Sequence, residues 1–557
     1  METSEKALYL YCFARSNFLG GLEGAGIDGA EPTLLFRWAA AGFLPNFGKL
    51  MARAAHGPLC STIHPLTPQA WTSMVTGVNP GRHGIFDFGK RAAHSYDIEL
   101  VDSRDRRAPA FWQFAPAGVR LGVANVPLTW PPEPLPGFMV AGMHAPSAAE
   151  AVWPPEILGE LGDGYRVDVM SHWYGGSARF LSDLFAMHDA RHAAFLRLWD
   201  HHLPDLGFFV YVAADRAQHA LWGAMTPAHV AEPRAHGDLG DAIFETYFAM
   251  DRALGDWLAR LGPDDSLLVV SDHGFGDLRR DVYLNRALID AGLLRFDPAK
   301  IRAFAPPPAP HADPQHAWVR EREPTGGSSA DDDETLALGL GDPRRLNFST
   351  VDWGATVAFS RGLCGNVWLN LEGREPEGCV RPVDEARTRE RVKKALLAIV
   401  DPDEGRPLVD RLIEKEEIYH GPSLADAPDL LVVMRDYAYT TRGATEFWGR
   451  TAVGPVVVGH TGNHRLHGVF LAAGPQIAPG PVAGAHIYDV LPTLFHAAGW
   501  PIPSDLDGRP LTEIFRPACR EIRYGPPTPE RTAQPSAMTA AEREVILQRL
   551  RDLGYFG

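Results

Sequence analysis

The segment LVVSDHGFG, residues 268–276, joins a short apolar run to an adjacent aspartate and histidine. The apolar run predicts a buried strand that ends just before Asp272 and His273. In open sheets of parallel strands, ligands gather beyond the carboxyl ends of the strands. An Asp–His pair at such an end offers a carboxylate and an imidazole to a metal ion. On this segment alone, a strand-to-turn junction with a capping aspartate is the favoured interpretation.

A second apolar run, LGFFVYV at 206–212, also predicts a buried strand. Between the two runs, apolar residues recur at steps of three and four, which is typical of an amphipathic helix. These residues are Ile243, Tyr247, Met250, Leu254, Trp257, Leu258 and Leu261. Strand–helix–strand alternation predicts an α/β fold with a largely parallel central sheet and helices on both faces.

Two further segments repeat the combination of aspartate and histidine. In FFVYVAADRAQHALWG, residues 208–223, Asp215 and His219 follow the strand four residues apart, which places them on one face of a helical turn. In GHTGNHRLHGVFLAAGP, residues 459–475, three histidines precede an apolar strand. A solvated loop fits the second segment, but so does the supply of an imidazole to a metal site.

The segment HPLTPQAWTSMVTGVNPGRHGIFDF, residues 64–88, predicts a helix that begins near Thr67 and Pro68 and ends at Gly77. Threonine is a good N-cap, and proline is favoured at the first helical position. A hydroxyl at a helix N-terminus lies where backbone N–H groups and the helix dipole attract an anion such as phosphate. An ordinary helix cap fits the local pattern equally well, because a threonine hydroxyl is a weak nucleophile until its pKa is lowered.

The N-terminal part of the chain carries Asp28 in GAGIDGAEP, residues 24–32, which by itself indicates a turn. The residues that lead to it, FLGGLEGAGIDG, are rich in glycine and poor in residues that favour strands. A clear strand, ALYLYCFA, lies upstream at residues 7–14. We therefore expect either a loop between this strand and Asp28, or a first strand that is weak or displaced.

The bulk composition limits the class of function. The 557-residue chain is 45% hydrophobic and 22% charged, with a net charge of −16. This is globular composition, and its acidity disfavours binding to nucleic acid polymers or anionic membranes. The five cysteines form no CxxC pair, so neither a disulfide framework nor a thiolate zinc site is expected. Because no signal peptide or membrane span is evident, a cytoplasmic location is expected.

Taken in order along the chain, these segments resemble the alkaline phosphatase superfamily, specifically its type I phosphodiesterase/nucleotide pyrophosphatase branch. The matching positions are Asp28, Thr67, the Asp215/His219 pair, the Asp272/His273 pair and His464. Further similarity lies in TSMVTGVNPGRHGIFDF at 72–88, VWLNLEGREPEG at 367–378 and YDVLPTLFHAAGWPIPSDLDGRPLTEIF at 488–515. The resemblance covers roughly residues 25–515.

The resemblance implies an alkaline-phosphatase-like three-layer sandwich and a two-metal phosphohydrolase. One divalent ion would be held by Asp215, His219 and His464. The other would be held by Asp28, Asp272, His273 and the oxygen of Thr67, which would also be the nucleophile and form a phospho-threonine intermediate. Mixed Asp/His ligation favours zinc, and manganese also fits. The expected substrate is a small phosphorylated molecule, most simply a phosphodiester of the nucleotide type.

Other readings stay open at this point. Phosphomonoesterase, phosphotransferase or mutase chemistry fits the same fold, and a non-catalytic binding protein on a decayed scaffold is a further alternative. A sulfatase is disfavoured because the chain has no CxPxR motif. A basic group after the nucleophile helix, comprising Arg82, His83, Lys90 and Arg91, is a candidate for binding substrate phosphate.

The domain organisation is expected to follow the motifs. Residues 1–300 form the first part of the catalytic core, and residues 451–520 complete it. Residues 301–450 form an inserted cap, with a mobile surface segment at 305–335 that is rich in Pro, Gly, Ser and charge. Residues 521–557 form a linker and a final helix, which begins at a capping box of Thr539 and Glu542.

Overall fold

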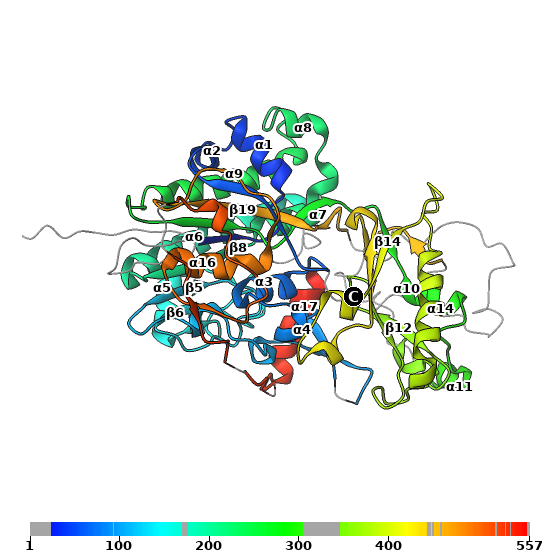
Figure 1. Ribbon diagram of the computed structural model, residues 1–557. Helices are drawn as coiled ribbons and strands as arrows, with labels where there is room; N and C mark the ends of the chain where they lie inside the picture. The colour runs from blue at the N-terminus through cyan, green and yellow to red at the C-terminus, as the bar shows by residue number, and fades with distance from the viewer. Residues whose placement is uncertain are drawn as a thin grey trace, which may run out of the picture.

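The computed structural model describes residues 24–553, except for residues 93, 170–175, 305–345, 443–446, 448–450, 457–458, 518–520, 530 and 535. The strand expected at 7–14 and the segment expected to be mobile at 305–335 lie outside the described residues. In the described part, a large mixed sheet lies between two layers of helices, and a smaller sheet with its own helices lies beside it (Figure 1).

The central sheet contains ten of the described strands. Their order is β20 (Gly480–Pro481), β2 (Ala55–Cys60), β19 (His467–Ala473), β9 (Leu267–Val270), β1 (Gly24–Ile27), β8 (Leu206–Tyr211), β5 (Leu121–Ala124), β6 (Gly137–Val140) and β7 (Val152–Trp153), and β21 (Ala485–His486) pairs with β2. Strands β9, β1, β8, β5 and β6 pair in parallel, whereas β19 runs antiparallel to both β9 and β2. The expectation of a largely parallel α/β sheet is confirmed.

Alternating side chains of the buried strands pack against helices on opposite faces. In β8, Phe209 and Tyr211 belong to one core cluster, and Phe208 and Val210 belong to the other. The first face is covered by α1 (Pro32–Ala40), α2 (Pro45–Met51) and α9 (Ala242–Leu258). The second is covered by α3 (Thr67–Thr76) and α16 (Val490–Ala498), and the long α6 (Gly176–His202) contributes to both. Figure 1 shows these as layers above and below the sheet. Burial on both faces explains why the strands read as continuous apolar runs.

The smaller sheet is antiparallel and lies to the right in Figure 1. Its order is β12 (Ala358–Arg361), β13 (Asn366–Leu369), β15 (Leu430–Met434) and β14 (Val409–Glu414). It shares a separate apolar cluster with α10 (Leu284–Asp290), α11 (Pro298–Ala303) and α14 (Glu385–Leu397). Two further sheets link the regions: β16 (Tyr439–Thr441), β11 (Arg280–Val282) and β17 (Val453–Gly454) form one, and β10 (Gly274–Asp277) with β18 (Gly462–Arg465) forms the other. The division into domains stays a prediction.

The remaining regular elements are short, apart from the last helix. They are β3 (Gly89–Arg91), β4 (Ile98–Leu100), β22 (Ile502–Pro503), β23 (Tyr524–Gly525), α4 (Pro80–His83), α5 (Leu158–Leu161), α7 (Ala213–Leu221), α8 (Pro227–Ala231), α15 (Lys415–Ile418) and α17 (Ala540–Asp552). The capping box expected at Thr539 and Glu542 is present at the start of α17. Among the helices described, none combines the length and the apolar character needed to cross a bilayer.

Strand β1 decides between the two expectations for the approach to Asp28 in favour of a weak or displaced first strand. Residues 24–27 form a strand that pairs in parallel with β8 and β9 and runs directly into Asp28, with no loop between them. A Cβ atom on Gly26 would lie only 2.4 Å from Cη2 of Trp71 and 2.8 Å from Cγ2 of Val210. The glycine that weakens the strand signal is therefore required by close packing against α3.

We expect Gly26→Ala to lower the free energy of unfolding by about 1–3 kcal/mol, because the added methyl group overpacks the contact with Trp71. Urea unfolding followed by circular dichroism would measure this loss. Gly159→Ala is the matched control, since a Cβ there meets nothing within 4 Å and the residue lies in α5. Equal stability of the Gly26→Ala variant and the natural protein would contradict the packing explanation.

Candidate metal centre

The predicted site residues converge at one edge of the central sheet. Asp28 follows β1 directly, Asp272 lies two residues beyond the end of β9, and Asp215 lies in the first turn of α7 after β8. These three strands are parallel, so their carboxyl ends meet at the same edge. Strand β2 leads to Thr67 at the same edge, and antiparallel β19 begins there, which brings in His464 from the preceding β18.

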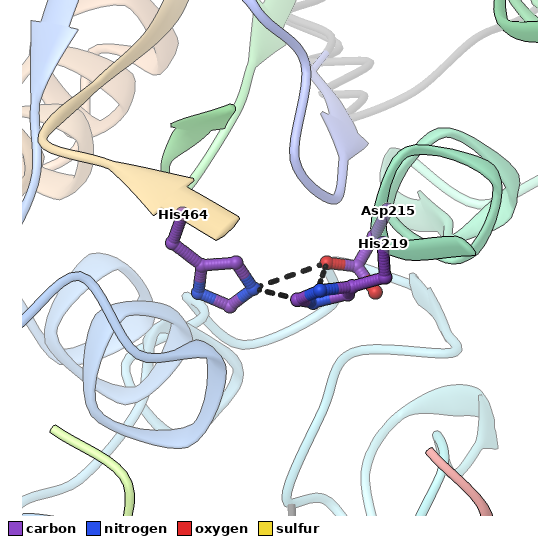
Figure 2. A group of neighbouring side chains, drawn as sticks. All are labelled: Asp215, His219 and His464. Atoms are coloured by element: carbon purple, nitrogen blue, oxygen red, sulfur yellow. Dashed lines mark hydrogen bonds and ion pairs between the residues drawn. The ribbon is translucent and has the colours of Figure 1, made fainter. Parts of the chain in front are cut away.

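The first group of ligand atoms comprises Asp215, His219 and His464 (Figure 2). The two Nε2 atoms of the histidines lie 2.9 Å apart. Oδ1 of Asp215 lies 3.4 Å from Nε2 of His219 and 3.3 Å from Nε2 of His464. Asp215 and His219 come from one face of α7, as their four-residue spacing predicts. Oδ1 of Asp215 and the Nε2 atoms of His219 and His464 therefore surround a common point.

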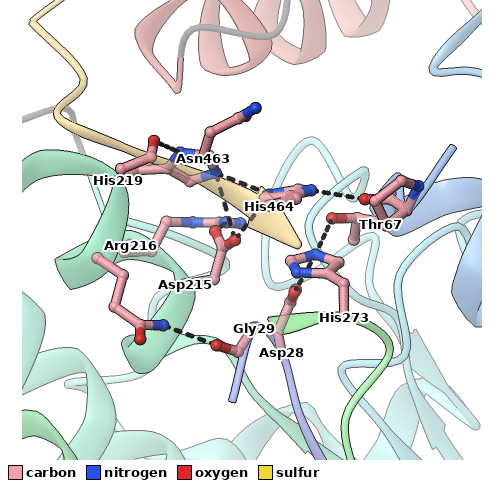
Figure 3. Close-up of polar contacts among 12 residues, drawn as sticks. Asp28, Gly29, Thr67, Asp215, Arg216, His219, His273, Asn463 and His464 are labelled. Atoms are coloured by element: carbon pink, nitrogen blue, oxygen red, sulfur yellow. Dashed lines mark hydrogen bonds and ion pairs between the residues drawn. The ribbon is translucent and has the colours of Figure 1, made fainter. Parts of the chain in front are cut away.

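The second group comprises Asp28, Asp272 and His273. Figure 3 shows the side chains of Asp28, His273 and Thr67 close together. Nε2 of His273 lies 3.5 Å from Oδ1 of Asp28, 3.2 Å from Oδ2 of Asp272 and 3.4 Å from the Oγ1 of Thr67. Helix α3 begins at Thr67 itself and Leu66 holds the N-cap position, so the expectation that Thr67 caps the helix is wrong by one residue. Its hydroxyl instead lies against the second group.

The two groups are adjacent. The imidazole rings of His273 and His464 stack with centroids 3.5 Å apart and an interplanar angle of 20°. All seven residues singled out in the sequence are thus brought together by the fold, in the two sets that the resemblance implies. Whether each residue binds a metal ion stays a prediction.

Backbone carbonyls fix the orientation of the three imidazoles. Nδ1 of His219 lies 3.2 Å from the carbonyl oxygen of Gly462, and Nδ1 of His464 lies 2.7 Å from that of Pro65. Nδ1 of His273 lies 3.2 Å from the carbonyl oxygen of Gly274. Because a carbonyl oxygen only accepts, each Nδ1 carries a proton, and the Nε2 atom of each ring faces the centre. Burial lowers the pKa of His273 and His464, which keeps these rings neutral.

Three buried carboxylates meet at the same place. Asp28, Asp215 and Asp272 have no exposed surface. Both carboxylate oxygens of Asp28 and Oδ2 of Asp272 lack a hydrogen-bonding partner in the described structure. Burial raises the pKa of Asp28 well above its ordinary value, and the charges of Asp272 and Asp215 raise it further. Burial likewise raises the pKa of Asp272, with a contribution from Asp215. Carboxylates that are buried together without hydrogen-bond donors are expected to bind a divalent cation, because the cation offsets their mutual repulsion.

Sequence reasoning missed a buried arginine that balances part of this charge. The guanidinium of Arg216 contacts the carboxylate of Asp215, and its Nη2 lies 2.8 Å from Oδ2 of Asp168. Burial alone would raise the pKa of Asp215, but His219 and Arg216 together hold it well below its ordinary value. The adjacency of Arg216 to Asp215 is visible in the sequence, whereas Asp168 lies 47 residues away from Asp215 and gives no signal there.

The basic group after α3, comprising Arg82, His83, Lys90 and Arg91, makes contacts elsewhere. Arg82 pairs with Asp505, Lys90 with Asp105, and Arg91 with Glu375. Nε2 of His83 lies 2.9 Å from the Oγ of Ser73. None of the four is among the described residues that line the cleft beside the metal-binding groups. The expectation that they bind substrate phosphate therefore has no support in this arrangement.

A cleft opens beside the first group, between the edge of the central sheet and the smaller sheet. Its described lining includes His219 and His464 on one side and residues of β15 and β16 on the other. His64, three residues before Thr67, also lines it. The cleft therefore gives access to His219 and His464 of the first group.

Comparisons with known proteins identify one family and several similar solved structures. A family model described as type I phosphodiesterase / nucleotide pyrophosphatase matches residues 25–464, from just before the first candidate ligand to the last. No curated protein matches the chain. Among solved structures, phosphonoacetate hydrolase from Sinorhizobium meliloti 1021 in complex with phosphonoacetate is similar at 17% identity and a TM-score of 0.49, over 88% of this chain and 99% of that one. Murine ectonucleotide pyrophosphatase / phosphodiesterase 5 is similar at 15% identity and a TM-score of 0.45, over 89% and 99%.

The family match covers most of the chain and confirms the resemblance that the ordered motifs carry. It also confirms, at the level of reaction class, that this is a hydrolase of phosphoric ester bonds. The chain belongs to the type I phosphodiesterase/nucleotide pyrophosphatase family.

Proposed function

We propose that this enzyme cleaves phosphate esters, with phosphodiesters of the nucleotide type favoured, by using two divalent metal ions and Thr67 as the nucleophile. One observation supports the proposal above the others. Two buried Asp/His groups lie side by side, and the hydroxyl of Thr67 lies 3.4 Å from a histidine of one of them. Such an arrangement suits a displacement at phosphorus, because charge must be neutralised close to the nucleophile.

Asp215, His219 and His464 would hold one ion, and Asp28, Asp272, His273 and the oxygen of Thr67 would hold the other. The donor set is mixed nitrogen and oxygen, which favours zinc, and manganese also fits. When bound, a pair of such ions lowers the pKa of the nucleophile and stabilises the oxygens that enter and leave. The protein contributes rigid geometry, since each imidazole is oriented by a carbonyl and each carboxylate is buried.

Thr67 is the residue that reacts. It is the first residue of α3, so the unpaired N–H groups of that turn and the helix dipole favour a phosphoryl group at its side chain. Attack by Oγ1 forms a bond to phosphorus while the bond to the leaving oxygen breaks. Water then hydrolyses the phospho-threonine, which releases phosphate or a phosphomonoester and restores the hydroxyl.

Removal of the nucleophile should separate chemistry from metal binding. We expect Thr67→Ala to lose about 10³-fold or more of kcat on a p-nitrophenyl phosphoester while most of the bound metal is kept. Thr76→Ala is the control, because Thr76 lies in the same helix and its hydroxyl bonds only to the carbonyl of Thr72 among the described contacts. Full activity in the Thr67→Ala variant would exclude this residue as the nucleophile.

Loss of a ligand should lower the metal content itself. We expect His464→Ala and Asp272→Ala each to bind about one ion fewer per chain than the natural protein, as measured by elemental analysis. Chelation should abolish turnover, and added zinc or manganese should restore it. His467→Ala is the control, since His467 is exposed at the start of β19. Unchanged metal content in both variants would contradict the assigned ligand sets.

Arg216 should act on the metal centre through Asp215. We expect Arg216→Met to destabilise the fold by about 3–5 kcal/mol, because Asp168 and Asp215 would stay buried without this cation. The double variant Arg216→Met with Asp168→Leu removes the charges of Arg216 and Asp168, leaves only Asp215 without this cation, and should recover part of that stability. Metal affinity in the double variant should still be about 10–100-fold weaker than in the natural protein. An unchanged affinity would leave Arg216 with a structural role only.

The ester class is decided by a matched panel of p-nitrophenyl mono- and diesters. A higher kcat/KM on the diester is the expected result, because the family is one of phosphodiesterases. A preference for the monoester would instead favour phosphomonoesterase chemistry on the same two groups of residues.

A further inference from the structure

The cleft beside the metal-binding groups has a wall that the proposed reaction does not use. Opposite His219 and His464 lie Leu363, Val432 and Met434, which belong to the region of the smaller sheet. This wall is apolar, and its three residues lie outside the segments that supply the candidate ligands. It is suited to contact the organic part of a substrate whose phosphoryl group lies at the metal centre.

Three buried polar atoms in the same lining have no hydrogen-bonding partner among the described residues. They are Nε2 of His64, the hydroxyl oxygen of Tyr437 and Nη2 of Arg442. The side chains of His64 and Arg442 are more than nine-tenths buried. An unsatisfied buried donor costs about 1–3 kcal/mol, so the guanidinium of Arg442 and the phenol of Tyr437 in one cleft indicate a ligand that supplies acceptors.

The described lining holds one permanent charge, that of Arg442, and its ion-pair partner Asp281 lies behind the lining. The described lining residues include neither aspartate nor glutamate. Burial lowers the pKa of His64 to about 3, so its ring is neutral. Burial raises the pKa of Tyr437, so its hydroxyl keeps its proton and can donate. The ligand that matches a guanidinium and a phenol is an oxyanion.

Asp281 positions Arg442 without covering the part of the guanidinium that lacks a partner. Nε of Arg442 donates to Oδ2 of Asp281 at 2.8 Å, and Asp281 has no exposed surface. The backbone N–H of Arg442 donates to the carbonyl of Val282, which ties the residue to β11. This fixed orientation prepares Nη2 to receive an acceptor with little loss of side-chain entropy.

We propose that Arg442 and Tyr437 bind a second anionic group, carried on the organic part of the substrate. The substrate class is then a phosphate ester whose other end bears an oxyanion, either a carboxylate or a second phosphate, joined to the ester by a short apolar segment. This inference rests on the proposed function, because it places the scissile phosphate at the metal centre. It adds a specificity-determining contact that the family match does not assign.

The test uses isosteric esters that differ in charge at the far end. The purified metal-loaded enzyme is assayed with 4-carboxyphenyl phosphate and 4-carbamoylphenyl phosphate, and with the methyl diesters of both. A third compound, 1,4-phenylene bisphosphate, presents phosphate in place of carboxylate. We expect kcat/KM to favour an anionic end over the carbamoyl end by about tenfold or more, mainly through KM, as for a hydrogen bond to a charged group. The anionic ester with the higher kcat/KM shows whether the site prefers a carboxylate or a phosphate at the far end of the substrate.

Two sets of variants test the assigned residues. Arg442→Gln is made together with Asp281→Asn, because removal of the arginine alone would leave a buried carboxylate unpaired and could prevent folding. Tyr437→Phe removes only one hydroxyl. Each of these changes should reduce the preference for the anionic ester. In the Arg442→Gln/Asp281→Asn pair, the ratio of kcat/KM for the anionic and carbamoyl esters should approach one. The control is Arg106→Gln with Glu133→Gln, a buried pair outside the described cleft lining, which should keep the full preference.

A binding measurement separates this proposal from the proposed function. The metal-loaded Thr67→Ala variant is titrated calorimetrically with the carboxyl and carbamoyl esters. Tighter binding of the carboxyl ester, lost with the Arg442→Gln/Asp281→Asn pair, supports the anion site even if no ester is ever hydrolysed. Equal kcat/KM and equal affinity for both esters, or a preference that survives in the Arg442→Gln/Asp281→Asn pair, overturns the anion site while hydrolysis itself stands.

Discussion

Three carboxylates that repel one another, Asp28, Asp215 and Asp272, are buried at the carboxyl edge of one sheet. A protein interior tolerates such a concentration of negative charge only when cations compensate it. One cation belongs to the chain, since Arg216 lies against Asp215, but Asp28 has no comparable partner among the described contacts. The parallel strands β1, β8 and β9 position the three aspartates. Backbone carbonyls orient the three imidazoles beside them.

The packing of α3, which carries Thr67, depends on the same strands. Trp71 of α3 lies against β1 so closely that a side chain at Gly26 would overlap it. That contact sets how near the first turn of α3, with Thr67, comes to Asp28 and His273. A bulkier residue in β1 would strengthen its propensity for a strand but push the helix away from the site. Residues that favour strands are therefore too large for this position, and glycine allows the close packing although it weakens the strand propensity.

The smaller sheet contributes to function through position. It brings Tyr437, Arg442 and an apolar wall to the cleft beside His219 and His464. The two sides of the cleft have different chemistry: ligand atoms for cations on one side, and hydrogen-bond donors with one guanidinium on the other. A substrate that bridges them must present negative charge at both ends, and this requirement is more selective than the metal centre by itself.

The sequence by itself determined several local elements and the identities of the candidate site residues. Apolar runs at 206–212 and 267–270 became β8 and β9, and the three- and four-residue spacing of apolar residues became α9, because these patterns record burial within single elements. The order of Asp28, Thr67, Asp215, His219, Asp272, His273 and His464 carries a family resemblance, and that resemblance implies two metal-binding groups. Only the tertiary structure decided that a glycine-rich segment is a central strand, since its stability comes from its neighbours β8 and β9. The partners of buried charges, such as Asp168 for Arg216 and Asp281 for Arg442, were likewise decided there, because they are remote in sequence and follow no periodic pattern.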